Sequence, residues 1–221
     1  IIAIILSSIS TMTNLYGQDC DQADFKDRFS GAQYHSISIS PDGTIDTWGN
    51  MHNANDVIAE DLSDVIAVSA GNKQTITLHS DRTIKVHGYY YGWVECCSYV
   101  DDMSSYNIPG EDNGTEGLSN VMSIAAGDEH NLALLLDGTV VAWGRNDPSN
   151  NHYNGQTDVP LDLIDVIAID AGYRFSIALK SDGTVVGWGN SEHNAENIPT
   201  GLSDVVAISS AQYENLALHS D

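Results

Sequence analysis

The chain has 221 residues, of which 42% are hydrophobic and 19 are glycine, enough for one sizeable domain with its own core. Its 31 acidic side chains against 8 basic ones give a formal charge of −23 at pH 7, which excludes nucleic acid as a partner because phosphates need Lys and Arg. This balance is typical of the solvated acidic surface of secreted or salt-adapted proteins; calcium binding is the alternative, but no loop of spaced Asp, Asn and Gly with a closing Glu supports it.

The first segment, residues 1–18, is predicted to be the apolar part and cleavage region of a secretory signal peptide. It has no initiator Met and no basic region before the apolar run, so its start reads as clipped. The run is too short to span a bilayer, and no other stretch could be a membrane helix. We therefore expect a secreted or extracytoplasmic protein without a membrane span, in which residues 19–30 form a lead-in segment.

Three cysteines leave the disulfide state open, because Cys20 could pair with either Cys96 or Cys97 and leave an odd thiol. A metal site would need two separated pairs, or Cys and His at ligand spacing, and the sequence has neither. Structural or incidental cysteine is the favoured interpretation.

From residue 31 onward the chain repeats itself. The unit Asn120–Gly144 reads as three short strands joined by a polar corner and an Asp-Gly hairpin. It recurs as Asp64–Gly88 and Asp165–Gly189, with an earlier copy at Gly31–Gly49 and the start of another at Asp204–Asp221. Short strands in a unit that repeats about every 40 to 45 residues predict an all-β fold. The expected architecture is a β-propeller of about four blades plus a partial fifth over residues 31–221.

Within each blade the pattern predicts that both faces of the sheet are buried and exclude water. In the first strand a column of small residues is flanked by branched ones, such as Ile66 and Val68 or Ile167 and Ile169, that should fill the other face. The predicted structural core of the repeat consists of Trp48, Trp143, Trp188, Gly127 and Gly172. The second blade, which contains the copy Asp64–Gly88 and is called blade 2, is irregular. In it His87 replaces the Trp and Arg82 replaces the hairpin glycine, where a positive φ would cost roughly 1 kcal/mol.

No enzyme is indicated. His35 and His130 share one repeat position with Gln74, Phe175 and Glu214, and this freedom favours turn packing and hydrogen bonding over catalysis. The sequence contains no nucleophile elbow, phosphate loop, dinucleotide fingerprint or zinc motif. No catalytic, cofactor-binding or metal-binding residues are therefore assigned, and no cofactor is expected.

Residues 126–144 follow the pattern Ala-Gly-x-x-His-x-x-Ala-Leu-x-x-Asp-Gly-x-Val-x-x-Trp-Gly. This pattern resembles the repeat of the regulator of chromosome condensation family. The short repeat length is similar to that of the bacterial secreted branch of the family, which includes a propeller-type β-lactamase inhibitor protein. The resemblance covers about residues 31–221. It implies a seven-bladed propeller, and therefore that this sequence is a fragment of a longer protein.

The exceptional segment is an insertion in blade 2, from about residue 89 to 117. It supplies a candidate interaction surface made of Tyr89, Tyr90, Tyr91, Trp93, Tyr99 and Tyr106. Tyr and Trp are favoured at interfaces because they bury much area with few torsions to freeze. An extra hairpin that packs these rings onto the propeller is an equally open interpretation.

The function favoured by these features is a secreted, non-catalytic scaffold that binds another protein, or a surface polymer, through its blade loops. One alternative is an intracellular guanine-nucleotide-exchange or chromatin-associated regulator, as the resemblance allows. The other alternative is a propeller enzyme such as a lyase, for which the sequence shows no residues.

Overall fold

The computed structural model describes residues 28–32, 35–40, 44–49, 62, 64–72, 74–88, 118–128, 130–144, 155–189 and 196–220. Their strands form five small antiparallel sheets, here called blades 1 to 5. Blades 1 and 2 contain β1 (Phe29–Gly31), β2 (His35–Ile39), β3 (Ile45–Gly49), β4 (Val65–Ala70), β5 (Gln74–His79) and β6 (Ile84–Gly88). Blades 3 to 5 contain β7 (Val121–Ala126), β8 (His130–Leu135), β9 (Val140–Gly144), β10 (Val166–Ala171), β11 (Phe175–Lys180), β12 (Val185–Gly189), β13 (Val205–Ser210) and β14 (Asn215–His219).

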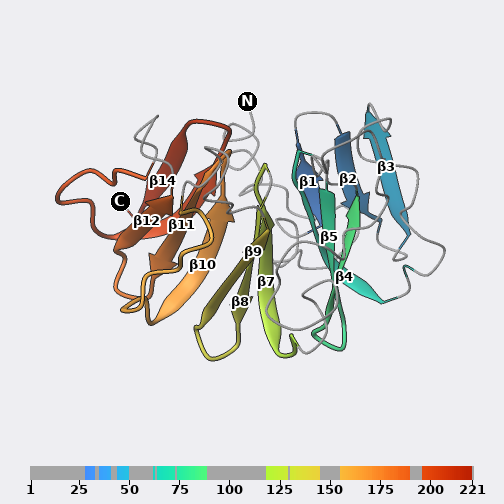
Figure 1. Ribbon diagram of the computed structural model, residues 1–221, viewed down its shortest axis with the longest axis horizontal. Coiled ribbons are helices and arrows are strands. Elements are labelled where there is room, and N and C mark those ends of the chain that lie inside the picture. The colour runs from blue at the N-terminus through green and yellow to red at the C-terminus, as the bar shows by residue number, and fades with distance from the viewer. Residues whose placement is uncertain are drawn as a thin grey trace, which may run out of the picture.

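The blades stand side by side in chain order, from β1–β3 in blue through β7–β9 to β14 in red (Figure 1). Each is an up-and-down meander in which neighbouring strands follow one another in sequence. The first strand of a blade packs against the first two strands of the preceding blade. This confirms the predicted all-β propeller architecture.

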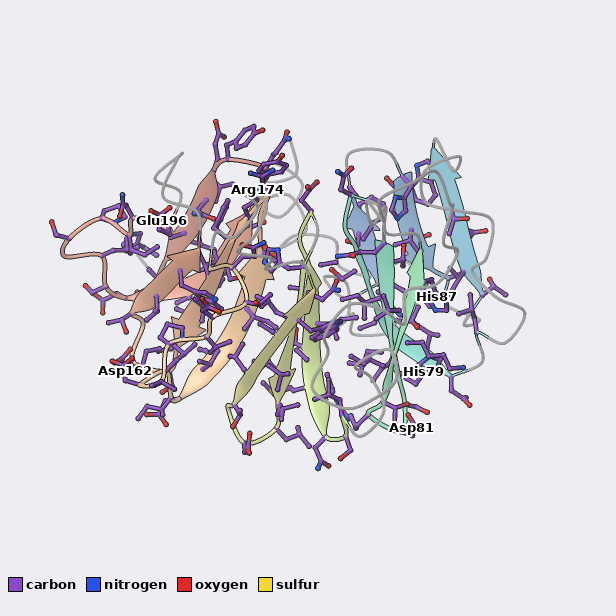
Figure 2. The ribbon with its side chains drawn as sticks, in the orientation of Figure 1. His79, Asp81, His87, Asp162, Arg174 and Glu196 are labelled. Carbon is purple, nitrogen blue, oxygen red and sulfur yellow. The ribbon has the colours of Figure 1, made fainter. Side chains whose placement is uncertain are left out.

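Two kinds of loop alternate along each blade, and we name them by position. A corner joins the first strand to the second, and a hairpin joins the second to the third. Because the strands are antiparallel, all corners lie at one end of the propeller and all hairpins at the other. Figure 2 shows these ends, with Arg174 of a corner at the top and Asp81 of a hairpin at the bottom.

The hairpins fold as their sequence predicts. Gly138 and Gly183 have φ values of 83° and 80°, a region that is open to glycine. Ahead of each glycine, the carboxylate of Asp137 or Asp182 accepts a hydrogen bond from the backbone N–H of the Thr two residues later, at 2.9 and 3.0 Å. Arg82 also has a positive φ, of 68°, so blade 2 carries the expected strain.

The expectation that both faces of every first strand are buried is wrong at one position in blades 2, 4 and 5, whereas the equivalent Met122 of blade 3 is half-buried and packs against the core. Ile66, Ile167 and Val206 are 38%, 50% and 53% exposed, whereas Val68 and Ile169 are buried. A β-bulge in the first strand of blades 2 to 5 causes the difference, since the register skips from Val65 to Ala67 in blade 2 and equivalently in blades 3 to 5. The extra residue turns outward, and alternation alone does not reveal it.

The repeated tryptophan has two different environments. Trp143 and Trp188 are 3% and 7% exposed, and each packs in the core shared with the preceding blade. Trp48 is 47% exposed, which corrects the expectation that it is buried, and its ring lies 5.8 Å from that of Phe29. The physical reason is position: Trp48 belongs to blade 1, and the described residues include no blade before it.

Polar side chains tie the first strands of successive blades together. The hydroxyls of Ser30 and Ser69 accept hydrogen bonds from the backbone N–H of Ala70 and Ala126 in the next blade, at 2.8 and 2.9 Å. Asp170 does the same for Ser210, at 2.8 Å. Blades are therefore joined by directional bonds as well as by apolar packing.

Candidate functional site

The predicted interaction surface, Tyr89, Tyr90, Tyr91, Trp93, Tyr99 and Tyr106, lies outside the described residues. The same holds for the three cysteines and for residues 1–18. The candidate site must therefore be sought on the two loop-bearing ends of the propeller.

At the corner end the loops of blades 2 to 4 each place one residue beneath the backbone of a glycine. A Cβ on Gly127 would overlap the His130 ring and lie 2.6 Å from the carbonyl oxygen of Gly172 in the next blade. Gly172 is similarly confined by the Phe175 ring and by the carbonyl oxygen of Ala211. Both predicted repeat glycines therefore occupy positions of close approach, where a side chain does not fit.

The corner residues reach into the next blade. His35 Nε2 lies 2.8 Å from Thr75 Oγ1, and His130 Nε2 lies 2.9 Å from Ser176 Oγ. Gln74 occupies the same position in blade 2 and donates to the carbonyl oxygen of His130 at 3.0 Å. All of these corner side chains are buried. Each one links its blade to the next.

Burial also sets the charge of these histidines. It lowers the pKa of His130 to about 4, and it lowers the pKa of His35 as well. Both imidazoles are therefore neutral near pH 7 and closed to solvent. Their geometry suits a structural hydrogen bond and leaves no room for a substrate.

On the outside of the same end, two corners form an aromatic and cationic cluster. The rings of Tyr173 in blade 4 and Tyr213 in blade 5 meet edge to face, with centroids 5.4 Å apart. The Arg174 guanidinium carbon lies 4.7 Å from the Tyr173 ring centroid, within cation–π range. Tyr213 is 44% exposed, and Gln212 Nε2 donates to its hydroxyl at 3.2 Å. We call Tyr173, Arg174 and Tyr213 the corner cluster.

The corner cluster was not predicted from the sequence, because Tyr213 lies about 40 positions after Tyr173 and Arg174, and the corner residues differ from copy to copy. One signal for it is present in the repeat alignment. The two residues after the corner glycine are Asn72 and Lys73 in blade 2 and Asp128 and Glu129 in blade 3, but Tyr173 and Arg174 in blade 4. An aromatic residue at a solvent-facing position of a polar loop calls for an explanation other than packing.

The hairpin end has the opposite character, because exposed carboxylates recur there from blade to blade. They belong to Asp64, Asp81, Asp137, Asp162, Asp165, Asp182 and Asp204. Hydrogen bonds from threonine lower the pKa of Asp81, Asp137 and Asp182, which keeps these groups ionised well into the acid range. Lys180 is paired at this end with Asp182, at 3.6 Å.

Within the described ranges, no group of three His, Cys, Asp or Glu side chains is placed to hold a metal ion. The same part of the chain contains no helix of the length and apolarity needed to cross a bilayer.

Comparison with known proteins agrees with the propeller architecture. Residues 121–156 and 166–195 match the model of the regulator of chromosome condensation (RCC1) repeat. The protein pim1 of Schizosaccharomyces pombe is 28% identical over 134 residues, which are 51% of this chain and 24% of pim1.

Solved structures share the fold at low identity. The ectodomain of the Physcomitrella patens receptor kinase CR4 superposes with a TM-score of 0.64 at 17% identity, over 87% of this chain and 50% of that one. Prp20p of Saccharomyces cerevisiae, a protein with binding properties to Gsp1p and histones, superposes with a TM-score of 0.60 at 17% identity, over 87% of this chain and 55% of that one. The chain spans about a quarter of pim1 and about half of these solved structures.

The glycine corners, the Asp-Gly hairpins and the buried tryptophans of blades 3 and 4 lie within the matched residues. Residues 121–156 and 166–195 are thus similar to the repeat of the regulator of chromosome condensation family, and the described part of the chain folds as a β-propeller.

Proposed function

We propose that this chain is a non-catalytic scaffold that binds another protein through the loops of its blades. The observation that carries the proposal is the corner cluster, in which Tyr173, Arg174 and Tyr213 are ordered against one another on the outside of the propeller. Tyr and Arg are enriched among the residues that dominate binding energy at protein interfaces. Their mutual contacts reduce the side-chain entropy that binding would otherwise cost.

The arrangement also explains why a loop end can bind without disturbing the fold. The backbone N–H of Tyr173 donates to the carbonyl oxygen of Gln212 at 3.2 Å, so the corners of blades 4 and 5 are joined by their main chains. Beneath them Phe175 is buried, at 2% exposed. The cluster therefore stands on a rigid base, and the exposed part of its side chains is accessible to a partner.

The test is a corner exchange within the molecule. The double variant Tyr173→Asn with Arg174→Lys gives blade 4 the corner residues of blade 2. We expect binding partners captured from the native source, quantified by mass spectrometry, to fall by roughly tenfold, while stability stays within about 1 kcal/mol of the parent. Undiminished capture by a variant of normal stability would place binding elsewhere.

A secreted or extracytoplasmic location is part of the proposal, and its support is the sequence alone, from apolar residues 1–18 and the charge of −23. Expression with this segment intact, followed by fractionation and N-terminal sequencing of the product, tests it. A product that keeps residues 1–18 and stays in the cytosol would contradict that location.

A second candidate is a regulator of the kind suggested by the likeness to pim1 and Prp20p. Gsp1p and histones, to which Prp20p binds, are the appropriate probes for it. Tight binding of either one to this chain, lost in the corner variant, would favour this candidate over an extracytoplasmic scaffold. Because a chain with a charge of −23 attracts basic histones without specificity, Gsp1p is the more informative probe.

A further inference from the structure

Three large apolar side chains are exposed at the hairpin end, one on the hairpin of blade 3 and two on the connector that leads into blade 4. Leu136 is 56% exposed, Ile164 is 60% exposed, and Leu161 is fully exposed. The hairpin that carries Leu136 lies against the start of blade 4, since a Cβ on Gly138 would lie 3.6 Å from the backbone nitrogen of Val166. We call Leu136, Leu161 and Ile164 the hairpin patch.

The other copies of the repeat show that these residues are exceptions. Where blade 3 has Leu136, the equivalent hairpin positions of blades 2, 4 and 5 are serine, Ser80, Ser181 and Ser220, and that of blade 1 is Pro41. Where the connector to blade 4 has Ile164, the other connectors have Ser63, Ser119 and Ser203. Where it has Leu161, they have Glu60, Glu116 and Thr200. Three positions that are polar in nearly every other copy are thus apolar in the hairpin of blade 3 and in the connector that leads into blade 4.

Packing does not account for the change. The leucine between the two connector positions is kept in every copy, and Leu163 packs into the core as Leu62, Leu118 and Leu202 do. Leu161 and Ile164 flank Leu163 but face solvent. Exposed apolar side chains gathered at one site, with no part in the core, indicate an interaction surface.

Charge identifies the kind of partner. Each apolar residue is followed directly by an aspartate, and Asp137, Asp162 and Asp165 are all exposed. A second copy of this chain would bring a charge of −23 against the same carboxylates, and anionic lipid would be repelled in the same way. A segment with apolar side chains flanked by Lys or Arg satisfies both features of the patch.

We propose that the hairpin patch, at the end of the propeller opposite the corner cluster, is a second binding surface that takes a basic amphipathic segment of a partner protein. The apolar side chains of Leu136, Leu161 and Ile164 contact the apolar face of the segment. The carboxylates of Asp137, Asp162 and Asp165 lie beside its cations. The surface is independent of the corner cluster, so either proposal can fail alone.

The experiment uses the whole chain and a fluorescent synthetic helix with leucine on one face and lysine on the other. The triple variant Leu136→Ser, Leu161→Thr, Ile164→Ser restores residues that the other copies have. We expect it to bind the peptide at least ~10-fold more weakly than the parent, with an unchanged melting temperature because the replaced side chains are exposed. The variant Asp137→Asn, Asp162→Asn, Asp165→Asn should also bind more weakly and with less dependence on salt.

Two controls make the result specific. A peptide with glutamate in place of lysine should not bind the parent. The variant Leu216→Ser with Leu218→Ser removes two exposed leucines from blade 5 and should leave the affinity unchanged. The proposal is overturned if the parent does not bind the lysine peptide, if the triple variant binds it as well as the parent, or if the blade 5 variant loses as much. It is also overturned if light scattering shows that the patch instead joins two copies of the chain.

Discussion

The two ends of this propeller are made by the same strands, yet they constrain their side chains in opposite ways. At the corner end the residue after the loop is buried in blades 1 to 4, as His130 is beside Ser176. At the hairpin end the corresponding side chains, such as Asp137, are exposed, and only the backbone is confined. A departure from the repeat therefore means different things at the two ends. At a buried corner position, a residue that differs from the other copies reflects packing. At an exposed hairpin position, such a residue can be selected for binding.

The largest expected contrast between the ends comes from matched glycine substitutions. Gly127→Ala at a corner should cost about 3 kcal/mol or more, because the new Cβ meets the His130 ring and the carbonyl oxygen of Gly172. Gly138→Ala at a hairpin should cost only about 1–2 kcal/mol, because the new Cβ would make ordinary contacts, at 3.6 Å or more, and the penalty is the positive φ of 83°. Denaturant unfolding of both variants measures the difference, and equal losses would mean that the corner can relax.

Acid should weaken the corner end before the hairpin end. A proton binds His130 in the unfolded chain near its ordinary pKa of 6.5, but in the folded chain only near about 4. The stability contributed by neutral His130 is therefore complete above pH 6.5 and is lost as pH falls from 6.5 towards 4, by about 2 kcal/mol between about pH 7 and about pH 5. Unfolding experiments across this range should show the loss.

The control for the acid experiment comes from the repeat itself. Gln74 occupies the same position in blade 2, so His130→Gln should reduce the pH dependence while keeping a side chain that can form hydrogen bonds. The carboxylates of Asp81, Asp137 and Asp182 have lowered pKa values, and they titrate below this range. An unchanged pH profile in the variant would assign the acid sensitivity to other groups.

The smallest expected effect is a gain at the hairpin end. Arg82 has a φ of 68° where blades 3 and 4 have glycine, so Arg82→Gly should stabilise the chain by about 1 kcal/mol. It removes one long contact, from Arg82 Nη1 to the carbonyl oxygen of Val121 at 3.5 Å, which is weak at that distance. The reverse change, Gly183→Arg, should lose at least as much, because a Cβ there would lie 3.0 Å from the backbone nitrogen of Asp204. A loss of stability in Arg82→Gly would show that the arginine contact outweighs the strain.

The sequence by itself determined the architecture, because local signals repeat in it. Asp-Gly hairpins, the glycine corners and a period of about 45 residues each report on backbone conformation within a few residues, and copies of one unit must pack as copies. For the same reason the hairpin strain at Arg82 was predictable, whereas the insertion, the cysteines and residues 1–18 lie outside the described residues and stay predictions.

Only the tertiary structure decided whether residues at the same repeat position have the same burial and the same contacts. Trp48 and Trp143 occupy one repeat position, but a preceding blade covers Trp143 and none among the described residues covers Trp48. The bulge that exposes Ile167 and the contact between Tyr173 and Tyr213 likewise depend on strand register and on neighbouring blades. Burial and contact arise between blades, over separations of about 40 residues, and a pattern read along one strand carries no information about them.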